Sequence, residues 1–395
     1  MARRIVKALS DLLAVLAFVV GISTPGVVML TRAETPEATT ENRALAAQPT
    51  WSWDWNAASD YPAAFEKFFD DAFGFRATLT RWHHLANFHA FGISPTSTVV
   101  VGKDGWLFLD YSMKMYRRET RCTEPELRLQ TRLLQERHDW LAAQGIKYLV
   151  VLVPNKPEVY PQFVPTATYQ PTPESYSDRL EAYAKSHGSF EVLNLRPALI
   201  EASKDTATFG ASDCHWNAFG GYVGYREIIN RLAGLVPGLA PPLTPQQCVM
   251  ETRPATGDLM HIMGFPELME PRIFMKPANP RSRGLEQWRG IRGWSVVTNV
   301  DDDRLPKAVI LHDSFMTAPS PFLAEHFQTA NFRWIYTDFD TVAIAELKPD
   351  VVIQELVERS VHELHRNPPE LAVPNSGPVI VHPPLAAGPA ASNRK

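Results

Sequence analysis

The chain has 395 residues and a formal net charge of −4 at pH 7, and 21% of its residues are charged. This balance argues against a protein that binds nucleic acid through a basic surface, because a phosphate backbone is neutralised by clustered Lys and Arg. The sequence contains no glycine-rich dinucleotide fingerprint, no phosphate-binding loop and no internal repeat. The length suits one sizeable α/β domain with additions.

An uncharged stretch at residues 12–30 follows Arg3, Arg4 and Lys7. At about 1.5 Å per residue it spans about 28 Å, which is enough to cross the hydrocarbon of a bilayer. The preceding basic residues predict a cytoplasmic N-terminus and an exported remainder. We expect residues 1–32 to be an uncleaved membrane anchor, with a cleaved signal as the alternative.

Composition divides the rest of the chain. Residues 33–50 are rich in Thr, Glu, Ala and Pro and predict a linker, and the Pro- and Ala-rich residues 367–395 predict a tail that buries little. Residues 51–366 are expected to form the folded domain. Near its start, the apolar spacing across residues 61–91 predicts amphipathic helices that pack into the core, and residues 99–109 predict a β-hairpin turning at Lys103-Asp104-Gly105.

Helical and strand patterns then alternate. This alternation, with short and nearly continuous apolar strands, predicts an α/β fold with a doubly wound parallel sheet and helices on both faces. One segment, residues 237–307, breaks the pattern and is either a lid or substrate platform or a structural elaboration. The expected helices cover residues 127–144, 174–187, 219–235 and 321–327, and the expected strands cover 147–153, 190–195, 308–311, 332–336 and 351–353.

Two short motifs carry the candidate chemistry. In Asp213-Cys214-His215 a carboxylate precedes an imidazole by two residues, and Ser314 follows an apolar strand at the edge where open α/β sheets place their active sites. A serine whose proton is taken by an imidazole, itself oriented by a carboxylate, is an activated nucleophile. We predict Asp213, His215 and Ser314 as the catalytic residues. Taken alone, each motif also fits a surface turn or a helix N-cap.

Other candidates flank this triad. Asn155 and Lys156 follow the strand at 147–153, and we expect them near the acyl or sugar site. Trp216, Asn217 and Asp313 are the remaining candidates for substrate or oxyanion contacts. We expect no metal and no cofactor, because no two His residues have helix-face spacing with an acidic third ligand.

Three cysteines allow at most one intramolecular disulfide. In an oxidising compartment Cys122 and Cys248 are the expected pair. Cys214 is expected to be a small buried thiol whose side chain points away from Asp213 and His215 if the segment is extended.

The motif Asp213-x-His215-Trp216-Asn217 resembles that of the alginate O-acetyltransferase family, whose members carry an SGNH-hydrolase-like domain and acetylate polysaccharides in the bacterial periplasm. One departure is His312, which stands where many SGNH enzymes have the glycine of a Gly-Asp-Ser motif. Other segments resemble the family's in the same order: residues 41–43, 61–76, 102–108, 153–156, 257–259 and 349–359.

The resemblance implies a periplasmic O-acetyltransferase, anchored to the inner membrane, that moves an acetyl group onto polysaccharide hydroxyls through an acyl-enzyme on Ser314. It also implies that a multi-pass membrane acyltransferase supplies the acetyl group. Two alternatives stay open. An SGNH-type esterase would pass the acetyl group to water, and a non-catalytic polysaccharide-assembly protein would not need the complete triad.

Overall fold

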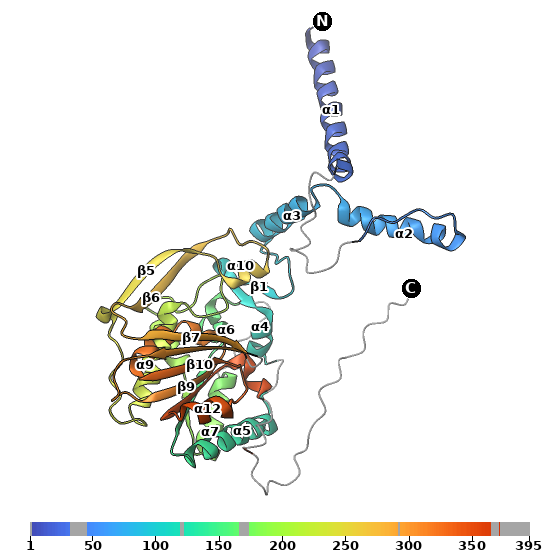
Figure 1. Cartoon of the computed structure of the whole chain (residues 1–395). Coiled ribbons are helices and arrows are strands. Elements are labelled where there is room, and N and C mark those ends of the chain that lie inside the picture. Colours follow the sequence, from blue (N-terminus) through green and yellow to red (C-terminus); the bar gives the residue numbers. More distant parts are fainter. Residues whose placement is uncertain are drawn as a thin grey trace. The chain divides into compact units, whose positions relative to one another are not determined.

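The computed structural model describes residues 2–31, 46–118, 122–165, 174–290, 293–364 and 371. Most of the predicted linker and tail lies outside these residues. The chain divides into two compact units (Figure 1). Unit 1 comprises residues 1–101 and 260–268, and unit 2 comprises residues 102–259 and 269–395.

Unit 1 is helical, with α1 (Ala2–Thr31), α2 (Trp55–Ala72) and α3 (Arg76–Phe91). Within α1, residues Leu9–Met29 are long and apolar enough to cross a membrane, and none of them is buried. An export signal would have the same length and composition.

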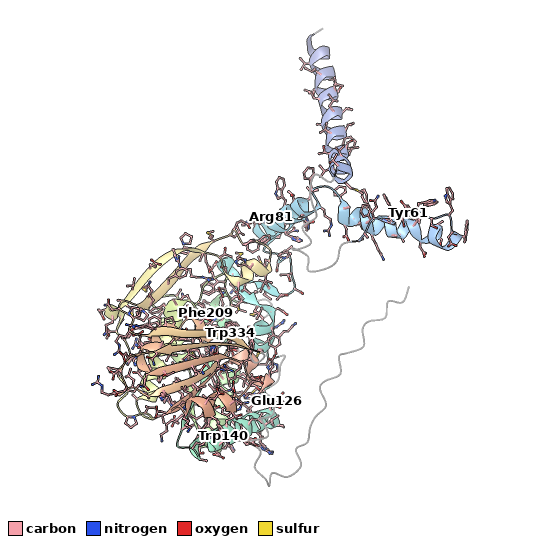
Figure 2. All side chains as sticks on the ribbon, viewed as in Figure 1. Tyr61, Arg81, Glu126, Trp140, Phe209 and Trp334 are labelled. Carbon is pink, nitrogen blue, oxygen red and sulfur yellow. The ribbon has the colours of Figure 1, made fainter. Side chains whose placement is uncertain are left out.

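The helices predicted across residues 61–91 are present, but the prediction that they pack into the core is wrong. Helix α3 buries none of its residues, and Phe65 and Phe69 on α2 are 40% and 39% exposed. Along α2, the ring of Tyr61, labelled in Figure 2, stacks on that of Phe65, which in turn lies against Phe69. An amphipathic pattern reports a helix with an apolar face and does not report what covers that face.

Unit 2 is built on a seven-stranded sheet with the order β4-β3-β11-β9-β10-β8-β7. The predicted parallel sheet is confirmed in its five strands from β4 to β10, which pair in parallel. Two antiparallel strands, β8 and β7, extend it beyond β10. The strands are β3 (Lys147–Val153), β4 (Glu191–Asn194), β7 (Arg283–Gly290), β8 (Gly293–Asn299), β9 (Lys307–His312), β10 (Thr329–Trp334) and β11 (Val351–Val357).

Both faces of the parallel part of this sheet are buried, as the apolar strands predict. Along β3, Leu149 and Val151 enter one core cluster while Val150 and Leu152 enter the other. Capping boxes begin two of the covering helices, at Thr123 before α5 and at Ser175 before α7. One core includes side chains of α8 (Arg196–Ala202), α9 (Ala218–Leu232) and α11 (Ser320–Leu323), and the other includes those of α5 (Glu124–Ala142), α7 (Tyr176–His187) and α12 (Thr341–Leu347).

The irregular segment at residues 237–307 forms two hairpins. Strands β5 (Cys248–Ala255) and β6 (Glu270–Pro277) pair with each other, and β7 and β8 join the main sheet. Residues on β6 and β8 reach the sites described below. The segment therefore contributes side chains to those sites.

All three cysteines are free thiols, so the predicted disulfide between Cys122 and Cys248 is wrong. Cys122 belongs to the core cluster on one face of the sheet, whereas Cys248 packs against the cluster on the other face. A disulfide needs Cα atoms within about 7 Å of each other, and the sheet separates these two.

Candidate active site

The carboxyl ends of β3, β11 and β9 are adjacent, since these strands are neighbours in the sheet. The chain leaves β9 at Asp313, whose carboxylate accepts hydrogen bonds from the backbone N–H groups of Phe315 (2.8 Å) and Val357 (3.1 Å). This cap begins the short helix η4 (Ser314–Thr317) and ties the turn to β11. Ser314 is thus fixed at the first position after the strand and its cap.

His215 lies in the loop before α9. Asn217 caps that helix by accepting from the Gly220 N–H at 2.9 Å, and its side-chain amide donates to the Ala207 carbonyl. Trp216 pairs with Phe209 in a β-bridge and donates its indole N–H to the Phe315 carbonyl at 2.8 Å. These contacts hold His215 beside the turn that carries Ser314.

The three residues predicted as a triad form one hydrogen-bonded chain. The Ser314 Oγ lies 2.8 Å from the His215 Nε2, and the His215 Nδ1 lies 2.9 Å from the Asp213 Oδ1. The Asp213 carboxylate also accepts the His215 backbone N–H at 2.9 Å. Such an arrangement can move a proton from the hydroxyl to the imidazole while the carboxylate fixes the ring.

A second carboxylate reaches the same imidazole; it belongs to the segment 257–259 that resembles the family's, but no role was predicted for it. The Asp258 Oδ2 lies 3.3 Å from the His215 Nδ1, and the Asp258 Oδ1 accepts the Cys214 backbone N–H at 2.7 Å. Asp258 begins α10 (Asp258–Ile262). Gly257, directly before it, is packed so closely that a Cβ there would overlap the backbone carbonyl of Ser212.

Arg272 of β6 donates to the Asp213 Oδ2, the carboxylate oxygen that His215 leaves free. Burial would raise the pKa of Asp213, but the hydrogen bond to His215 and the charge of Arg272 outweigh burial and hold that pKa well below its usual range. Asp213 is therefore a carboxylate under all ordinary conditions.

The pKa of the His215 imidazole shifts in the opposite direction to that of Asp213. Burial would lower the pKa of His215, but the hydrogen bonds to Asp213 and Asp258 outweigh burial and raise that pKa above its usual value. The two carboxylates thus make His215 a stronger base than an isolated imidazole.

Cys214 does not point away from the triad, as an extended segment would require. Its Sγ donates to the Asp258 Oδ2 at 2.8 Å and lies 3.6 Å from the His215 Nδ1. The loop turns at this position, so side chains of neighbouring residues come to one side. Burial raises the pKa of the Cys214 thiol, which keeps it protonated and a poor nucleophile.

Among the described residues, one cluster gathers metal-ligating atoms within 4.8 Å of one another: Asp213, Cys214, His215 and Asp258. Atoms of these four residues that could bind a metal form hydrogen bonds with one another, and Arg272 adds a positive charge beside the Asp213 carboxylate. The geometry is that of a hydrogen-bonded relay, and we assign no metal role to these residues.

Lys156 is buried next to the loop that carries Asp213 and does not reach an open surface. It is 2% exposed, and its Nζ donates to the backbone carbonyls of Leu107 (2.8 Å), Ala211 (2.7 Å) and Asp213 (3.0 Å). Burial lowers the pKa of Lys156 to about 7. Its placement suits a brace for the loop that carries Asp213.

Asn155 is buried between three side chains. Its Oδ1 accepts from the Ser112 hydroxyl (3.2 Å) and from the Arg359 Nη1 (3.4 Å), and its Nδ2 donates to the Glu358 Oε2 at 3.2 Å. The guanidinium of Arg359 also lies 4.9 Å from the centre of the Phe315 ring, next to Ser314. Sequence reasoning gave no role to this cation, which comes from the 3₁₀ helix η6 (Glu358–Glu363) directly after β11.

Replacing Asp258 with asparagine is expected to move the acidic limb of the kcat/KM profile to lower pH by about one unit. Asp258 stabilises the imidazolium, so its neutral isostere lowers the pKa of His215 and the basic form appears at lower pH. The rate at which an acetyl ester is consumed, measured between pH 4 and 9, tests this shift of the acidic limb. An unchanged limb in a folded D258N variant would show that Asp258 does not act on His215.

Comparison with known proteins places this site in a family context. Residues 99–280 match the family model described as "SGNH hydrolase-like domain, acetyltransferase AlgX". Over 227 residues the chain is 25% identical to the probable alginate O-acetylase AlgJ of Pseudomonas syringae pv. tomato, which covers 58% of this chain and 56% of that protein. AlgJ of Pseudomonas aeruginosa is 27% identical over 176 residues, 42% of each chain.

The chain therefore matches only about half the length of these curated relatives. Among solved structures, PatB1 of Bacillus cereus aligns with a TM-score of 0.52 at 13% identity, covering 69% of this chain and 98% of that one. At this level of identity the likeness concerns the fold. The match of residues 99–280 confirms the predicted SGNH-hydrolase-like class, and the sequence matches confirm the resemblance to the alginate O-acetyltransferase family.

Proposed function

From the match of residues 99–280 to the SGNH hydrolase-like acetyltransferase family, we propose that the chain is an exported O-acetyltransferase acting on polysaccharide hydroxyls through a serine acyl-enzyme. The single observation that carries the proposal is the hydrogen-bonded chain from Asp213 through His215 to Ser314. A non-catalytic assembly protein would have no use for a serine hydroxyl aligned with a strengthened base.

In the first half-reaction, the Ser314 Oγ attacks the acetyl carbonyl of the donor and its proton passes to the His215 Nε2. Asp213 and Asp258 stabilise the imidazolium that forms. The backbone N–H of Ser314 and the guanidinium of Arg359 are the groups we assign to the developing oxyanion. The donor's leaving group then departs with the proton from His215, leaving acetyl on Ser314.

In the second half-reaction, a sugar hydroxyl takes the place of the leaving group. His215 removes its proton, the hydroxyl oxygen attacks the acetyl carbonyl, and Ser314 recovers its hydrogen from the imidazolium. If water attacks instead, the same residues make an esterase. The two reactions therefore differ only in which acceptor reaches the acyl-enzyme.

An acceptor experiment separates these reactions. The full chain in detergent is incubated with an activated acetyl ester, with and without oligosaccharides of several polymer types, and the sugars are analysed by mass spectrometry. We expect an acetylated sugar and faster donor turnover when the acceptor is present, because a bound hydroxyl has a high effective concentration. Acetate release without acetylated sugar for every polymer would favour the esterase.

We further propose that residues 51–366 act outside the cytoplasm and that α1 anchors them to the inner membrane. A multi-pass membrane acyltransferase would then deliver the acetyl donor at the same membrane. The support is the apolar length of Leu9–Met29, together with the basic residues that precede it.

Topology is testable with a reporter. A phosphatase fused after Arg32 is expected to be active only when α1 is intact and the fusion lies outside the cytoplasm. If the mature protein were found to begin near Ala33, α1 would be a cleaved signal and not an anchor. Activity of a cytoplasm-specific reporter at the same position would contradict export.

A further inference from the structure

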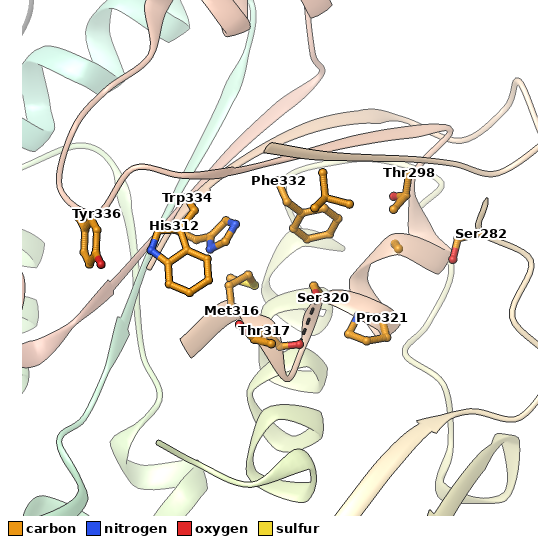
Figure 3. Close-up of a pocket in the computed structure, with 12 residues that line it drawn as sticks. Ser282, Thr298, His312, Met316, Thr317, Ser320, Pro321, Phe332, Trp334 and Tyr336 are labelled. Carbon is orange, nitrogen blue, oxygen red and sulfur yellow. Dashed lines mark hydrogen bonds between the residues drawn. The ribbon is translucent and has the colours of Figure 1, made fainter. Parts of the chain in front are cut away.

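A cavity of about 760 Å³ lies between the end of β9, strands β8 and β10, and the segment that follows Ser314 (Figure 3). This volume is within the range of small-molecule sites. Its wall includes Thr298, His312, Met316, Phe332, Trp334 and Tyr336. None of these residues belongs to the relay that joins Asp213 to Ser314.

The cavity wall nevertheless includes residues on both sides of the proposed nucleophile in the sequence. His312 and Met316 both line it, and Ser314 lies midway between them along the chain. With Cα atoms 3.8 Å apart per step, the Cα of Ser314 is within about 7.6 Å of either one. The backbone of Ser314 is therefore close to two residues of the cavity wall.

Aromatic rings form one wall. Figure 3 shows the rings of His312, Phe332 and Trp334 gathered above Met316 and Thr317, with Tyr336 at one end. The His312 ring centre is 6.0 Å from that of Trp334. Tyr336 is 55% exposed, so its ring is available at the mouth. Flat apolar rings of this kind pack against the C–H faces of ligands whose edges are polar.

His312 supplies an unused hydrogen-bond acceptor. It is 7% exposed, and its Nδ1 donates to the Asp313 carbonyl at 2.7 Å, which leaves the Nε2 lone pair free. Within the described part of the chain, the Nε2 has no hydrogen-bond partner. Burial lowers the pKa of His312, so the ring is neutral and its Nε2 accepts. A ligand that meets this atom must carry an O–H or N–H donor.

Among the described residues, no charged side chain lines the cavity. Of the described residues that line the cavity, none is Lys, Arg, Asp or Glu; the polar ones are hydroxyl residues such as Ser282, Thr298 and Thr317, besides His312. A carboxylate placed here would lose its hydration without meeting a cation. An acyl chain would fit the apolar wall but would leave the His312 acceptor unpaired.

We propose that this cavity binds a neutral sugar ring of the acceptor polysaccharide, stacked on Trp334, with Tyr336 at its edge, since the two aromatic rings are inclined by 68°, and with one hydroxyl donating to the His312 Nε2. The identity of that ring as part of an acceptor rests on the proposed acetyltransferase function; its binding does not. The proposal implies that the acceptor ring bound in this cavity is uncharged, in contrast to the uronates of alginate.

Binding is measured on the full chain in detergent with Ser314→Ala, so that no turnover intervenes. Neutral hexasaccharides of glucose, mannose and galactose are compared with a hexauronate by calorimetry. We expect at least one neutral hexamer to bind at least about tenfold more tightly than the hexauronate. Trp334→Ala is expected to weaken that binding about tenfold, as loss of a ring contact would.

Two further variants complete the test. Tyr336→Asn removes the second ring and suits the positive φ of 53° at that position, so it guards against misfolding of the Trp334 variant. Trp82→Ala, which removes a 67% exposed tryptophan in unit 1, is the matched control and should leave binding unchanged. The proposal is overturned if the hexauronate binds as tightly as every neutral hexamer, or if both pocket variants retain the original Kd. Failure of acetyl transfer, by contrast, appears only in the turnover assay.

Discussion

Ser314→Ala is expected to reduce turnover of an activated acetyl ester by roughly 10⁴-fold or more, because the nucleophile is then missing and the relay has nothing to activate. His215→Ala and Asp213→Ala are each expected to cause large losses as well. The three residues form one hydrogen-bonded unit, so the triple variant should be little worse than Ser314→Ala alone.

A matched control separates chemistry from folding. Ser186 is an exposed serine on α7 that bonds only within its own helix, and Ser186→Ala should keep full turnover. Thermal unfolding of each variant shows whether it is folded. Near-normal turnover by a folded Ser314→Ala variant would remove the proposed nucleophile.

Gly257→Ala is expected to damage the site and the fold together. The new Cβ would overlap the backbone carbon and oxygen of Ser212, which are not free to rotate away as a side chain would. Relief of this clash must separate the two segments and break the hydrogen bond from the Leu259 N–H to the Ser212 carbonyl (3.1 Å). We expect a loss of about 2 kcal/mol or more in the free energy of unfolding.

The same shift carries Asp258 away from His215, so donor turnover should fall as well. Gly284→Ala is the matched control. A Cβ at Gly284 would meet no atom within 4 Å, and the backbone φ of Gly284 is not in the left-handed region. Urea unfolding and ester turnover are measured on both variants. Equal stability of the two would show that the contact between Gly257 and Ser212 is loose.

The fold was predictable where the signal is local. Apolar runs identified β3, β9 and the first residues of β11, because strands buried on both faces are rich in apolar residues. The position of Ser314 followed from the rule that sites of open α/β sheets lie at the carboxyl ends of strands. In the structure, Asp213 is hydrogen-bonded to His215, and His215 to Ser314. Their catalytic roles stay a prediction until variants are assayed.

The missed features depend on partners far along the chain. Asp258 and Arg272 reach Asp213 and His215 across more than 40 residues, from a segment with little periodic pattern. Sequence placed Lys156 near the site but did not reveal that its ammonium turns inward to three carbonyls. The prediction of a disulfide between Cys122 and Cys248 failed for a similar reason, because the sequence does not tell on which face of the sheet each cysteine lies.

The most direct test of the proposed serine chemistry is to trap the acyl-enzyme. The full chain is mixed with an activated acetyl ester, quenched in acid within the first turnovers, digested and analysed by mass spectrometry. We predict one acetyl group on the peptide that contains Ser314, absent from Ser314→Ala and accumulating when no sugar acceptor is added. Acetyl on Cys214, or donor turnover with no acetylated Ser314 at any time, would contradict the account.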